Sequence, residues 1–482
     1  MILRTIRHLR PTGAYALMLA AAVGAFLLVR TYGETLPPPP AEPSAAAGPA
    51  TARPADTLAR LLLALGVVVA AGRGLGAAFA RLRQPPVIGE VVAGILLGPS
   101  LLGRIAPSAQ EALFPAEVVP LLAAVAQLGV ILYMFLVGVE LDAGSLGGRA
   151  HAAVAVSHAG IVVPFVLGAV LALGLYPSLA GPGVPFTPFA LFLGVSLSVT
   201  AFPVLARILT DRGLSRTRLG AVALTCAAAD DVTAWCLLAF VTGVARAAVG
   251  GAVLAAALTA AYAGFVAVAV RPLAERLAAR CEGRPCPRGA LAAVLVALLA
   301  SALATEAIGV HALFGAFLLG CVIPHGSGLA RALTRRLEDV VTVLLLPAFF
   351  ALTGLRTQVG LVSGAGAWLV CGLIVLVATA GKAGGAAVAA RVTGLGWRDS
   401  AALGVLMNTR GLMELIVLTV GLDLGILSPT LFAMLVLMAV ATTLATTPIL
   451  DRLAPASLLA RPADARPARR VRWPRPRVVR HG

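Results

Sequence analysis

The sequence predicts an all-α polytopic membrane protein with about 13 core transmembrane helices, two inverted five-helix repeats, broken crossing helices and one N-terminal hydrophobic segment. Of its 482 residues, 59% are hydrophobic and only 12% are charged, and the mean hydropathy is +0.95. Apolar runs of about 18 or more residues recur from end to end. Each is long enough to cross a hydrocarbon layer roughly 30 Å thick as a helix.

The first apolar run, Ala14 to Val29, follows the basic start MILRTIRHLR and precedes the proline-rich stretch TLPPPPAEPSAAAGPATARPAD. The run fits either a cleaved signal peptide or a retained anchor. The anchor is favoured because the small-residue sites lie well past the run. In both cases the basic start lies inside and the linker outside, so residues 1–56 are expected to form a hydrophobic segment and an external linker.

Residues 57–450 are expected to form the transmembrane domain, and residues 451–482 a basic cytoplasmic tail. Alternation of the helices, starting from outside, puts nearly all the arginine-rich loops and the tail in the cytoplasm, as the positive-inside rule requires. The expected location is therefore the cell membrane. The predicted spans are approximately 57–80, 86–103, 118–139, 151–175, 187–207, 219–243, 250–270, 289–307, 310–324, 339–354, 364–390, 400–421 and 429–449.

The net charge of +17 fits loops and a tail that face anionic lipid, and it does not indicate nucleic-acid binding. Four of the six cysteines fall within apolar runs, and Cys281 and Cys286 lack the second pair that a zinc site needs. We therefore expect structural cysteines, no metal site and no cofactor.

Short internal matches predict two related halves. AGILLGP (Ala93 to Pro99) in the second span resembles GAFLLGC (Gly315 to Cys321) in the ninth, and FLVGVELD in the third resembles FALTGLRT in the tenth. Each pair is seven spans apart, and an odd offset reverses the direction across the membrane. Spans two to six and nine to thirteen are therefore expected to form an inverted repeat of five helices each, as in many transporters.

The repeat pairs span five with span twelve, and both contain residues that break helices. Pro203 in SVTAFPVLAR has no amide hydrogen and frees carbonyls near Val199 and Thr200. MNTRGLMEL in span twelve supplies Asn408, Thr409 and a flexible Gly411. Exposed backbone at membrane depth is tolerated only where it lines protein or a water-filled cavity. Each segment alone fits a proline kink or a polar helix contact; the matched pair indicates a binding site.

Two adjacent acids, Asp230 and Asp231, lie near the midpoint of span six, beside broken span five. A charge at the centre of a lone helix costs about 2.5–3.5 kcal/mol, so the pair needs a partner. Lys382 in TAGKAGG is the only lysine in the sequence. A desolvated ammonium can lose its proton, whereas a guanidinium cannot. We therefore expect Lys382 to pair with one of the two acids.

Successive helix residues point about 100° apart, so the two acids can serve different neighbours. One can pair with Lys382 while the other faces a cavity, where a carboxylate holds either a proton or a small monovalent cation. If the helix cluster crosses the membrane only when that carboxylate is occupied, cations and protons exchange. The residues therefore predict secondary transport that exchanges a small monovalent cation for H⁺ at one of the two acids, with no enzymatic reaction.

Several long motifs in this order resemble the monovalent cation:proton antiporter-2 family: RQPPVIGEVVAGILLGPSLLG, LGVILYMFLVGVELD and SVTAFPVLARILTDRGL. LGVLMNTRGLMELIVLTVG and LFAMLVLMAVATTLATTPIL are especially similar to the plant cation/proton exchanger branch. The resemblance covers about residues 57 to 450. It implies a thirteen-helix fold with a moving core domain and a dimerisation domain, hence a homodimer. It also implies exchange of Na⁺ or K⁺ for H⁺.

By this resemblance, Asp231 matches the essential ion-binding aspartate, and Asp230 and Lys382 match the ion pair of electrogenic sodium/proton antiporters. Thr200 and Asn408 fall in the crossing helices and are expected to contribute to cation or proton binding. The plant exchangers usually have Asn or Gln at the position of Asp230. The stoichiometry and the choice of cation therefore stay open.

Other polar residues receive lesser roles. Arg410 and Glu414 are four residues apart, which indicates an ion pair that stabilises the crossing helix. Pro203 and Gly411 are likewise expected to shape the crossing helices. Acids near predicted cytoplasmic helix ends are expected to be solvated, two histidines to be satisfied between helices, and Glu306 to have no role. The acids are Glu90, Glu140 and Asp142, and the histidines are His158 and His311.

Two other classes of transport remain as alternatives. A K⁺ efflux channel-like transporter of the same fold would conduct without a proton requirement. An organic-solute symporter with an inverted-repeat fold would need more hydrogen-bonding side chains than this Ala- and Gly-rich site offers. A sensor would need a signalling domain, and none is visible in the sequence.

Overall fold

The structure is a computed structural model that describes residues 11–37, 54–140, 150–212, 214, 217–246, 249–283 and 285–453. Among these, twelve helices are long and apolar enough to cross a membrane, or thirteen if the pair Trp397–Met407 and Leu412–Asp423 is one bent span; Ala312–Cys321 is a shorter apolar helix. Every predicted span corresponds to one of these helices or helix pairs, so the polytopic fold is confirmed. The proline-rich linker and nearly all of the basic tail lie outside the described residues.

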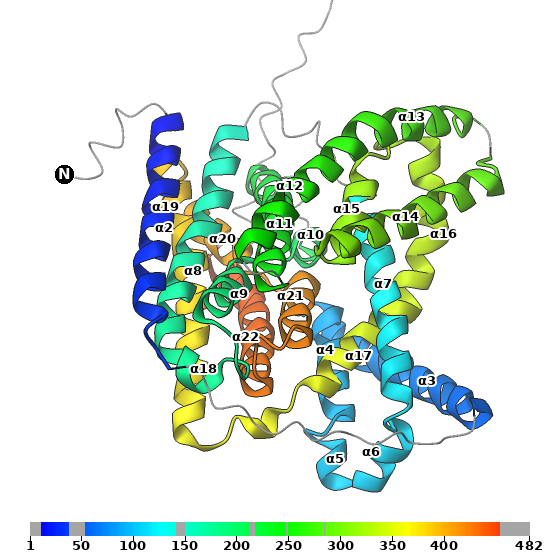
Figure 1. The fold of residues 1–482 in the computed structure, drawn as a ribbon, viewed down its shortest axis with the longest axis horizontal. Helices are drawn as coiled ribbons and strands as arrows, with labels where there is room; N and C mark the ends of the chain where they lie inside the picture. Colours follow the sequence, from blue (N-terminus) through cyan, green and yellow to red (C-terminus); the bar gives the residue numbers. More distant parts are fainter. Residues whose placement is uncertain are drawn as a thin grey trace, which may run out of the picture.

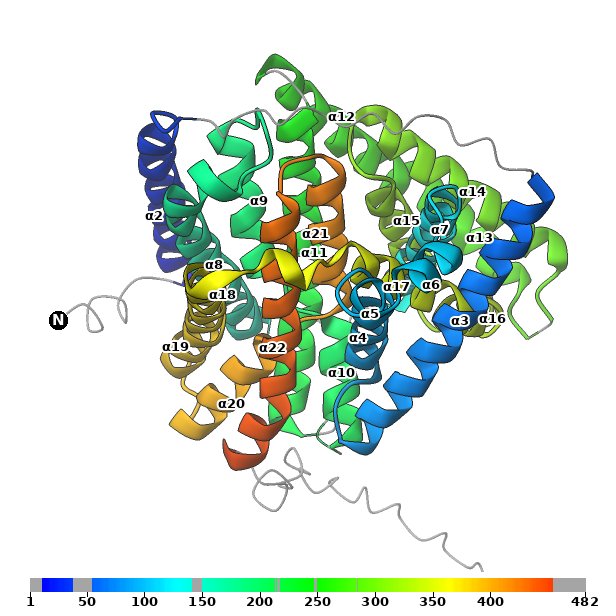
Figure 2. The same ribbon diagram turned by 90° about the horizontal axis from the view of Figure 1, so that it is seen from below.

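One group of helices contains both broken spans, and we call it the crossing bundle. It occupies the left and centre of the molecule in Figure 1 and Figure 2. Its elements are α8 (Ala150–Leu179), α9 (Phe186–Ser198), α10 (Phe202–Asp211), α11 (Arg218–Arg246), α18 (Gly364–Thr379), the π-helical turn η6 (Ala380–Gly384), α19 (Gly385–Val392), α20 (Trp397–Met407), α21 (Leu412–Asp423) and α22 (Pro429–Leu453).

The remaining core helices pack beside the crossing bundle, and we call them the scaffold. Most of them lie to the right of the crossing bundle in both views, and α12 lies beside α11. The elements are α3 (Pro54–Arg81), α4 (Pro86–Leu97), α5 (Leu102–Ile105), α6 (Pro107–Leu113), α7 (Val118–Glu140), α12 (Val249–Phe265), η3 (Val266–Val270), α13 (Arg271–Arg280), α14 (Arg288–Ile308), α15 (Ala312–Cys321), α16 (Gly328–Val340), η4 (Val341–Leu345), α17 (Leu346–Arg356) and η5 (Val359–Leu361).

Helix contacts in the scaffold follow the predicted inverted repeat. The repeat pairs α4 with α15, and α7 with α17. In one half α4 packs against α17, and in the other half α15 packs against α7. Both contacts depend on glycine: a Cβ on Gly94 would lie 2.7 Å from the Cα of Ala351, and a Cβ on Gly320 would lie 2.2 Å from the carbonyl oxygen of Phe135. The halves therefore interlock through equivalent close approaches.

Two stretches predicted as cytoplasmic loops are helical. Residues 271–280 form α13, which continues α12, and most of residues 325–339 form α16, which continues into α17. Each has a buried apolar side, such as Leu329 and Leu333 in α16, and Ser327 caps α16 by accepting a hydrogen bond from the Ala330 amide at 3.1 Å. The many charged residues of these two stretches favoured a loop in the sequence analysis, although their apolar residues recur with the spacing of an amphipathic helix. Cys281 and Cys286, between α13 and α14, form a disulfide.

Buried apolar side chains of the described residues form two clusters, one at each end of the crossing bundle. The larger cluster joins α9 and α21 to scaffold helices α7, α15 and α17. The buried residues of the smaller one belong to the crossing bundle alone, chiefly to α10, α20 and the first half of α11. The crossing bundle therefore shares an apolar core with the scaffold at the α9/α21 end, and has a core of its own at the α10/α20 end.

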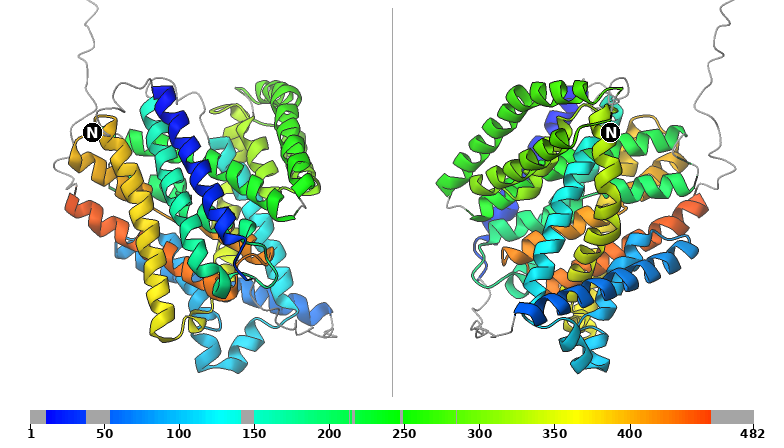
Figure 3. Two further views of the ribbon diagram at one scale, coloured as in Figure 1. Left: turned by 60° about the vertical axis from the view of Figure 1, so that its left-hand side comes forward. Right: turned by 90° about the vertical axis from the view of Figure 1, so that its right-hand side faces the viewer.

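The N-terminal hydrophobic helix α2 (Pro11–Gly33) lies along the crossing bundle rather than the scaffold, against α8 and α9 (Figure 3). The rings of Phe26 and Phe165 have centroids 5.8 Å apart, and Thr187 donates a hydrogen bond to Glu34 at 3.0 Å. We propose that α2 is retained as an anchor that moves with this bundle.

Candidate functional site at the helix crossing

The two broken spans meet at their breaks. Helix α9 ends at Ser198 and α10 begins at Phe202, while α20 and α21 are bent by 43° across residues 408–411. The amide of Ala201 in the first break donates a hydrogen bond to the carbonyl of Thr409 in the second, at 2.9 Å. Backbone groups freed by one break thus find partners in the other, which makes exposed backbone tolerable at membrane depth.

Pro203 and Gly411 serve the crossing in different ways. Pro203 lies in the first turn of α10, where its missing amide hydrogen costs nothing, so it starts a new helix rather than kinking an old one. Flexibility is not the reason for Gly411, because its φ of 175° is extended backbone that any residue adopts. A Cβ there would lie 2.6 Å from Cγ2 of Val204, so glycine is required for the close approach of α10.

Asp230 accepts hydrogen bonds from three side chains on three other elements. Ser157 of α8 donates to Oδ1 at 2.7 Å, and Thr200 in the first break donates to Oδ2 at 2.5 Å. Lys382 of η6 forms an ion pair with Oδ2 at 2.6 Å. All four side chains are buried. The carboxylate is therefore fixed in position and has its charge compensated.

Asp231 has the opposite environment, although it is the next residue. It is fully buried, and neither carboxylate oxygen has a hydrogen-bond partner in the described part of the chain. The amide of Phe202, at the positive end of α10, is close enough to act on it electrostatically. Oδ1 of Asn408 in the second break is also buried without a partner. An unpaired buried carboxylate is costly, so this group needs a proton or a cation.

Two buried cations hold the C-terminal end of α9, where the last carbonyls have no partner within the helix. Arg410 donates to the carbonyls of Ser196 at 2.8 Å and Leu197 at 2.7 Å, and Lys382 donates to that of Ser198. Positive charge at this end also suits the helix dipole. Arg410 pairs with Glu414 at 2.5 Å, as the spacing predicted.

Thr443 of α22 completes the second break, and the sequence analysis did not include it. Its hydroxyl accepts a hydrogen bond from the amide of Arg410 at 2.9 Å and donates one to the carbonyl of Arg410 at 2.7 Å. Ser157 was missed as well. Both are ordinary hydroxyl residues in apolar helices, and no signal in the sequence distinguishes them from the other serines and threonines.

Comparison with known proteins identifies the family of the chain. The family model described as "Sodium/hydrogen exchanger, transmembrane" matches residues 66–452, which include both breaks and the paired acids. The chain belongs to the sodium/hydrogen exchanger family.

Several named antiporters are similar to this family member. Na(+)/H(+) antiporter NhaS4 of Synechocystis sp. is 44% identical over 405 residues, covering 83% of this chain and 98% of that protein. Cation/H(+) antiporter 17 of Arabidopsis thaliana is 41% identical and K(+)/H(+) antiporter 1 of Saccharomyces cerevisiae is 35% identical, over 81% and 79% of this chain. The chain spans only about half the length of these two relatives, 48% and 44%.

A solved structure has the same fold. The sodium proton antiporter MjNhaP1 from Methanocaldococcus jannaschii, at pH 8, matches with a TM-score of 0.59 and 14% identity, covering 84% of this chain and 99% of that one. At this identity the likeness shows the fold alone.

The buried charges of the exchanger's crossing bundle are unequal in number. Among the described residues of the bundle, they are three carboxylates and two cations: Asp230, Asp231, Glu414, Lys382 and Arg410. One monovalent cation or one proton therefore neutralises the cluster. The described residues contain no group of three or more His, Cys, Asp or Glu side chains suited to a metal ion.

Lys382 lies in a segment where η6 and the start of α19 approach α8 closely. A Cβ on Gly381 would lie 2.9 Å from the Cα of Pro164, and one on Gly385 would lie 3.0 Å from the carbonyl oxygen of Ala159. The small residues of TAGKAGG therefore bring the lysine stem close to α8 and α9, and π-helical turns are frequent at functional sites.

The lesser predictions have mixed outcomes. Glu90 is buried rather than solvated, packed where α4 faces Gly72 and Gly76 of α3, whereas Glu140 is exposed. Glu306 has a role after all, because its carboxylate accepts a hydrogen bond from the amide of Ala312 at the start of α15, at 3.0 Å. Asp142 lies outside the described residues.

Proposed function

We propose that the chain exchanges a monovalent cation, Na⁺ or K⁺, for H⁺ across the cell membrane, with both ions competing for Asp231. The observation that carries the proposal is the contrast between two adjacent acids. Asp230 has three side-chain donors, whereas no side chain in the described part of the chain donates to either oxygen of buried Asp231. A lone carboxylate with spare oxygens can hold a proton or a cation, but not both.

The cation ligands follow from the unpartnered oxygens. Both oxygens of Asp231 and Oδ1 of Asn408 lack a partner among the described residues, and Thr200 in the first break supplies a hydroxyl oxygen. Oxygen ligands suit hard cations. The relatives, which include an Na(+)/H(+) antiporter and a K(+)/H(+) antiporter, support exchange and leave both cations open.

Asp230 and Lys382 set the charge carried in each cycle under this proposal. If their ion pair stays intact, one cation exchanges for one proton at Asp231. If Lys382 releases its proton when the cation binds, a second proton moves and the exchange becomes electrogenic. Ser157 is a positioning residue, because its hydrogen bond holds the carboxylate of Asp230 in place beside Lys382.

Sidedness and assembly are also proposals. The α10/α20 end adjoins arginine-rich segments such as Arg207, Arg212 and Arg398, so it is proposed to face the cytoplasm, with the basic tail on anionic lipid. The α9/α21 end then faces outward, and the scaffold provides the surface for a homodimer.

The test is dissipation of a pH gradient in everted vesicles when Na⁺ or K⁺ is added. The variants are Asp231→Asn, Lys382→Ala and Glu34→Gln; the last removes an acid at the exposed end of α2 and serves as control. We expect the unmodified chain and the control to move protons, and Asp231→Asn to be inactive. The responding cation identifies the substrate.

Two results would reject this function. Cation flux without proton movement would favour the channel-like alternative, and persistent exchange in Asp231→Asn would remove the shared carboxylate. If Lys382→Ala converts exchange that depends on membrane potential into exchange that does not, the role of the ion pair in setting charge is supported.

A further inference from the structure

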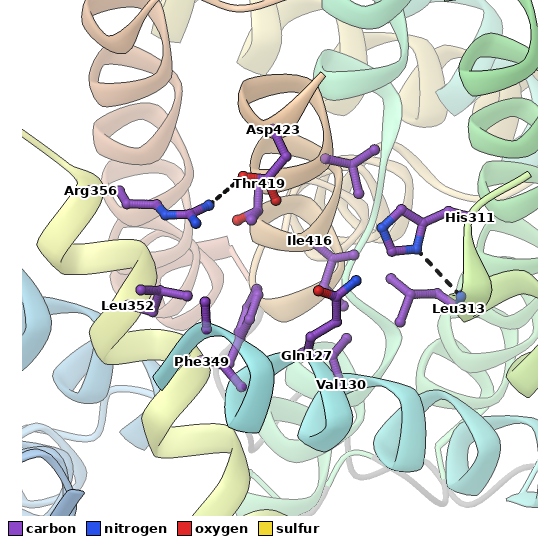
Figure 4. A pocket seen from close by; sticks show the side chains of 13 residues that line it. Gln127, Val130, His311, Leu313, Phe349, Leu352, Arg356, Ile416, Thr419 and Asp423 are labelled. Atoms are coloured by element: carbon purple, nitrogen blue, oxygen red, sulfur yellow. Dashed lines mark hydrogen bonds and ion pairs between the residues drawn. The ribbon is translucent and has the colours of Figure 1, made fainter. Parts of the chain in front are cut away.

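A cavity of about 60 Å³ lies between the crossing bundle and the scaffold at the α9/α21 end. Figure 4 shows it between α7, α17 and α21, with His311 at the start of α15 on one side. Its polar wall includes Gln127 of α7 and Thr419 of α21, and its floor is apolar. Gln127 is exposed although it lies within the α7 span.

One ion pair joins the two sides of this cavity. Arg356, in the last turn of scaffold helix α17, pairs with Asp423, the last residue of α21, at 2.6 Å (Figure 4). The side chain of Arg356 is 28% exposed and that of Asp423 is 53% exposed. The pair therefore links the crossing bundle directly to the scaffold, at the partly exposed rim of the cavity rather than in the buried interior.

The position of Asp423 is unfavourable for its own helix. Negative charge at a helix C-terminus opposes the helix dipole, whereas positive charge there is favourable. Arg356 suits the end of α17, but Asp423 does not suit the end of α21. Stabilisation of α21 alone does not explain this acid, and its partner Arg356 is a cation from the other side of the cavity.

The apolar packing shows that this end of the interface is closed. At the α9/α21 end the crossing bundle and scaffold share one apolar cluster, and at the α10/α20 end the bundle has its own. Alternating access to Asp231 requires the shared cluster to separate at the α9/α21 end. Arg356 and Asp423 lie on opposite sides of that plane, so their contact cannot survive the separation.

We propose that the Arg356–Asp423 pair is the outer latch of the exchanger, holding the outer cavity closed while Asp231 is accessible from the cytoplasm. The proposal rests on the proposed function and on its orientation of the α9/α21 end. Opening the latch widens the cavity between α7 and α21 into the outward path. Because the pair is partly exposed, its effect on the ratio of the two states is modest, about two- to fivefold.

The test measures access to the outer cavity directly. The free cysteines Cys226, Cys236, Cys321 and Cys371 are replaced by alanine, and the disulfide is left in place. Thr419→Cys then serves as the reporter, because Thr419 lines the cavity and its hydroxyl bonds to its own helix at Leu415. Its labelling rate by a membrane-impermeant maleimide is measured in right-side-out vesicles, with exchange followed in the same preparation.

The variants separate a latch from a general charge effect. Arg356→Gln and Asp423→Asn are expected to raise the labelling rate about two- to fivefold, and the exchanged pair Arg356→Asp with Asp423→Arg to restore it. Glu275→Gln is the matched control, because its ion pair with Arg271, at 3.0 Å, lies within α13 and crosses no interface. It should leave labelling unchanged.

The outcomes distinguish the latch from the proposed function. Unchanged labelling in both single variants, in vesicles that still exchange cations for protons, overturns the latch alone. An equal rise in Glu275→Gln overturns it too, since the effect would then reflect loosening of the whole fold. Absence of exchange in the unmodified chain overturns the proposed function.

Discussion

Thr443→Val tests whether the second break depends on a side chain from a neighbouring helix. The substitution keeps the shape of the residue but removes a hydroxyl that serves both the amide and the carbonyl of Arg410, at 2.9 and 2.7 Å. Two backbone groups in a fully buried break then lose their partner. Each interhelical hydrogen bond in a membrane contributes about 0.6–1.7 kcal/mol, so we expect a loss of about 1–3 kcal/mol of stability.

Thr442→Val is a closely matched control for this substitution. Thr442 is also buried on α22, but its hydroxyl bonds only to carbonyls of its own helix, at Met438 and Ala439. Thermal unfolding of the purified protein in detergent, followed for both variants and for Thr443→Ser, measures the difference. We expect Thr443→Val to melt lowest and Thr443→Ser to retain most of the stability. Equal melting of the two valine variants would refute the role of Thr443 in the break.

Three further substitutions test other parts of the account. Glu414→Gln leaves a buried guanidinium without a counter-charge and should cost about 3–5 kcal/mol, read as lost folded protein on expression. Gly320→Ala places a methyl group 2.2 Å from a backbone oxygen of α7 and should lower the melting temperature, whereas Gly174→Ala, with no atom within 4 Å, should not. Ser157→Ala removes one hydrogen-bond donor to Asp230 and should raise the cation concentration for half-maximal exchange about fivefold, while Ser157→Thr keeps the donor and should leave it unchanged. Unchanged cation dependence in Ser157→Ala would leave Ser157 a packing role only.

Much of the fold could be predicted because the membrane restricts it so strongly. Only helices satisfy their backbone groups in hydrocarbon, so apolar runs locate spans directly. The repeat offset then paired Pro203 with the region around Gly411, and the two breaks do meet. Hydropathy was less informative where helices are amphipathic: α13 and α16 have enough arginine to resemble loops.

The composition of the site was only partly predictable. Asp230, Asp231 and Lys382 stand out because charge is costly in a membrane, and the structure brings Asp230 and Lys382 into contact. Ser157 and Thr443 could not be singled out, since a hydroxyl is cheap in any helix and its importance depends on what lies opposite. Asp230 and Asp231 are adjacent on one helix, so the sequence alone could not show which of them would be left unpaired. That depended on three-dimensional packing.

Competition between proton and cation at Asp231 is tested most directly by proton release from the purified protein in weakly buffered detergent solution. Cation binding to a protonated carboxylate must displace the proton, so the account predicts about one proton released per cation bound, and none from Asp231→Asn. Cation binding without proton release, or release that persists in Asp231→Asn, would contradict it.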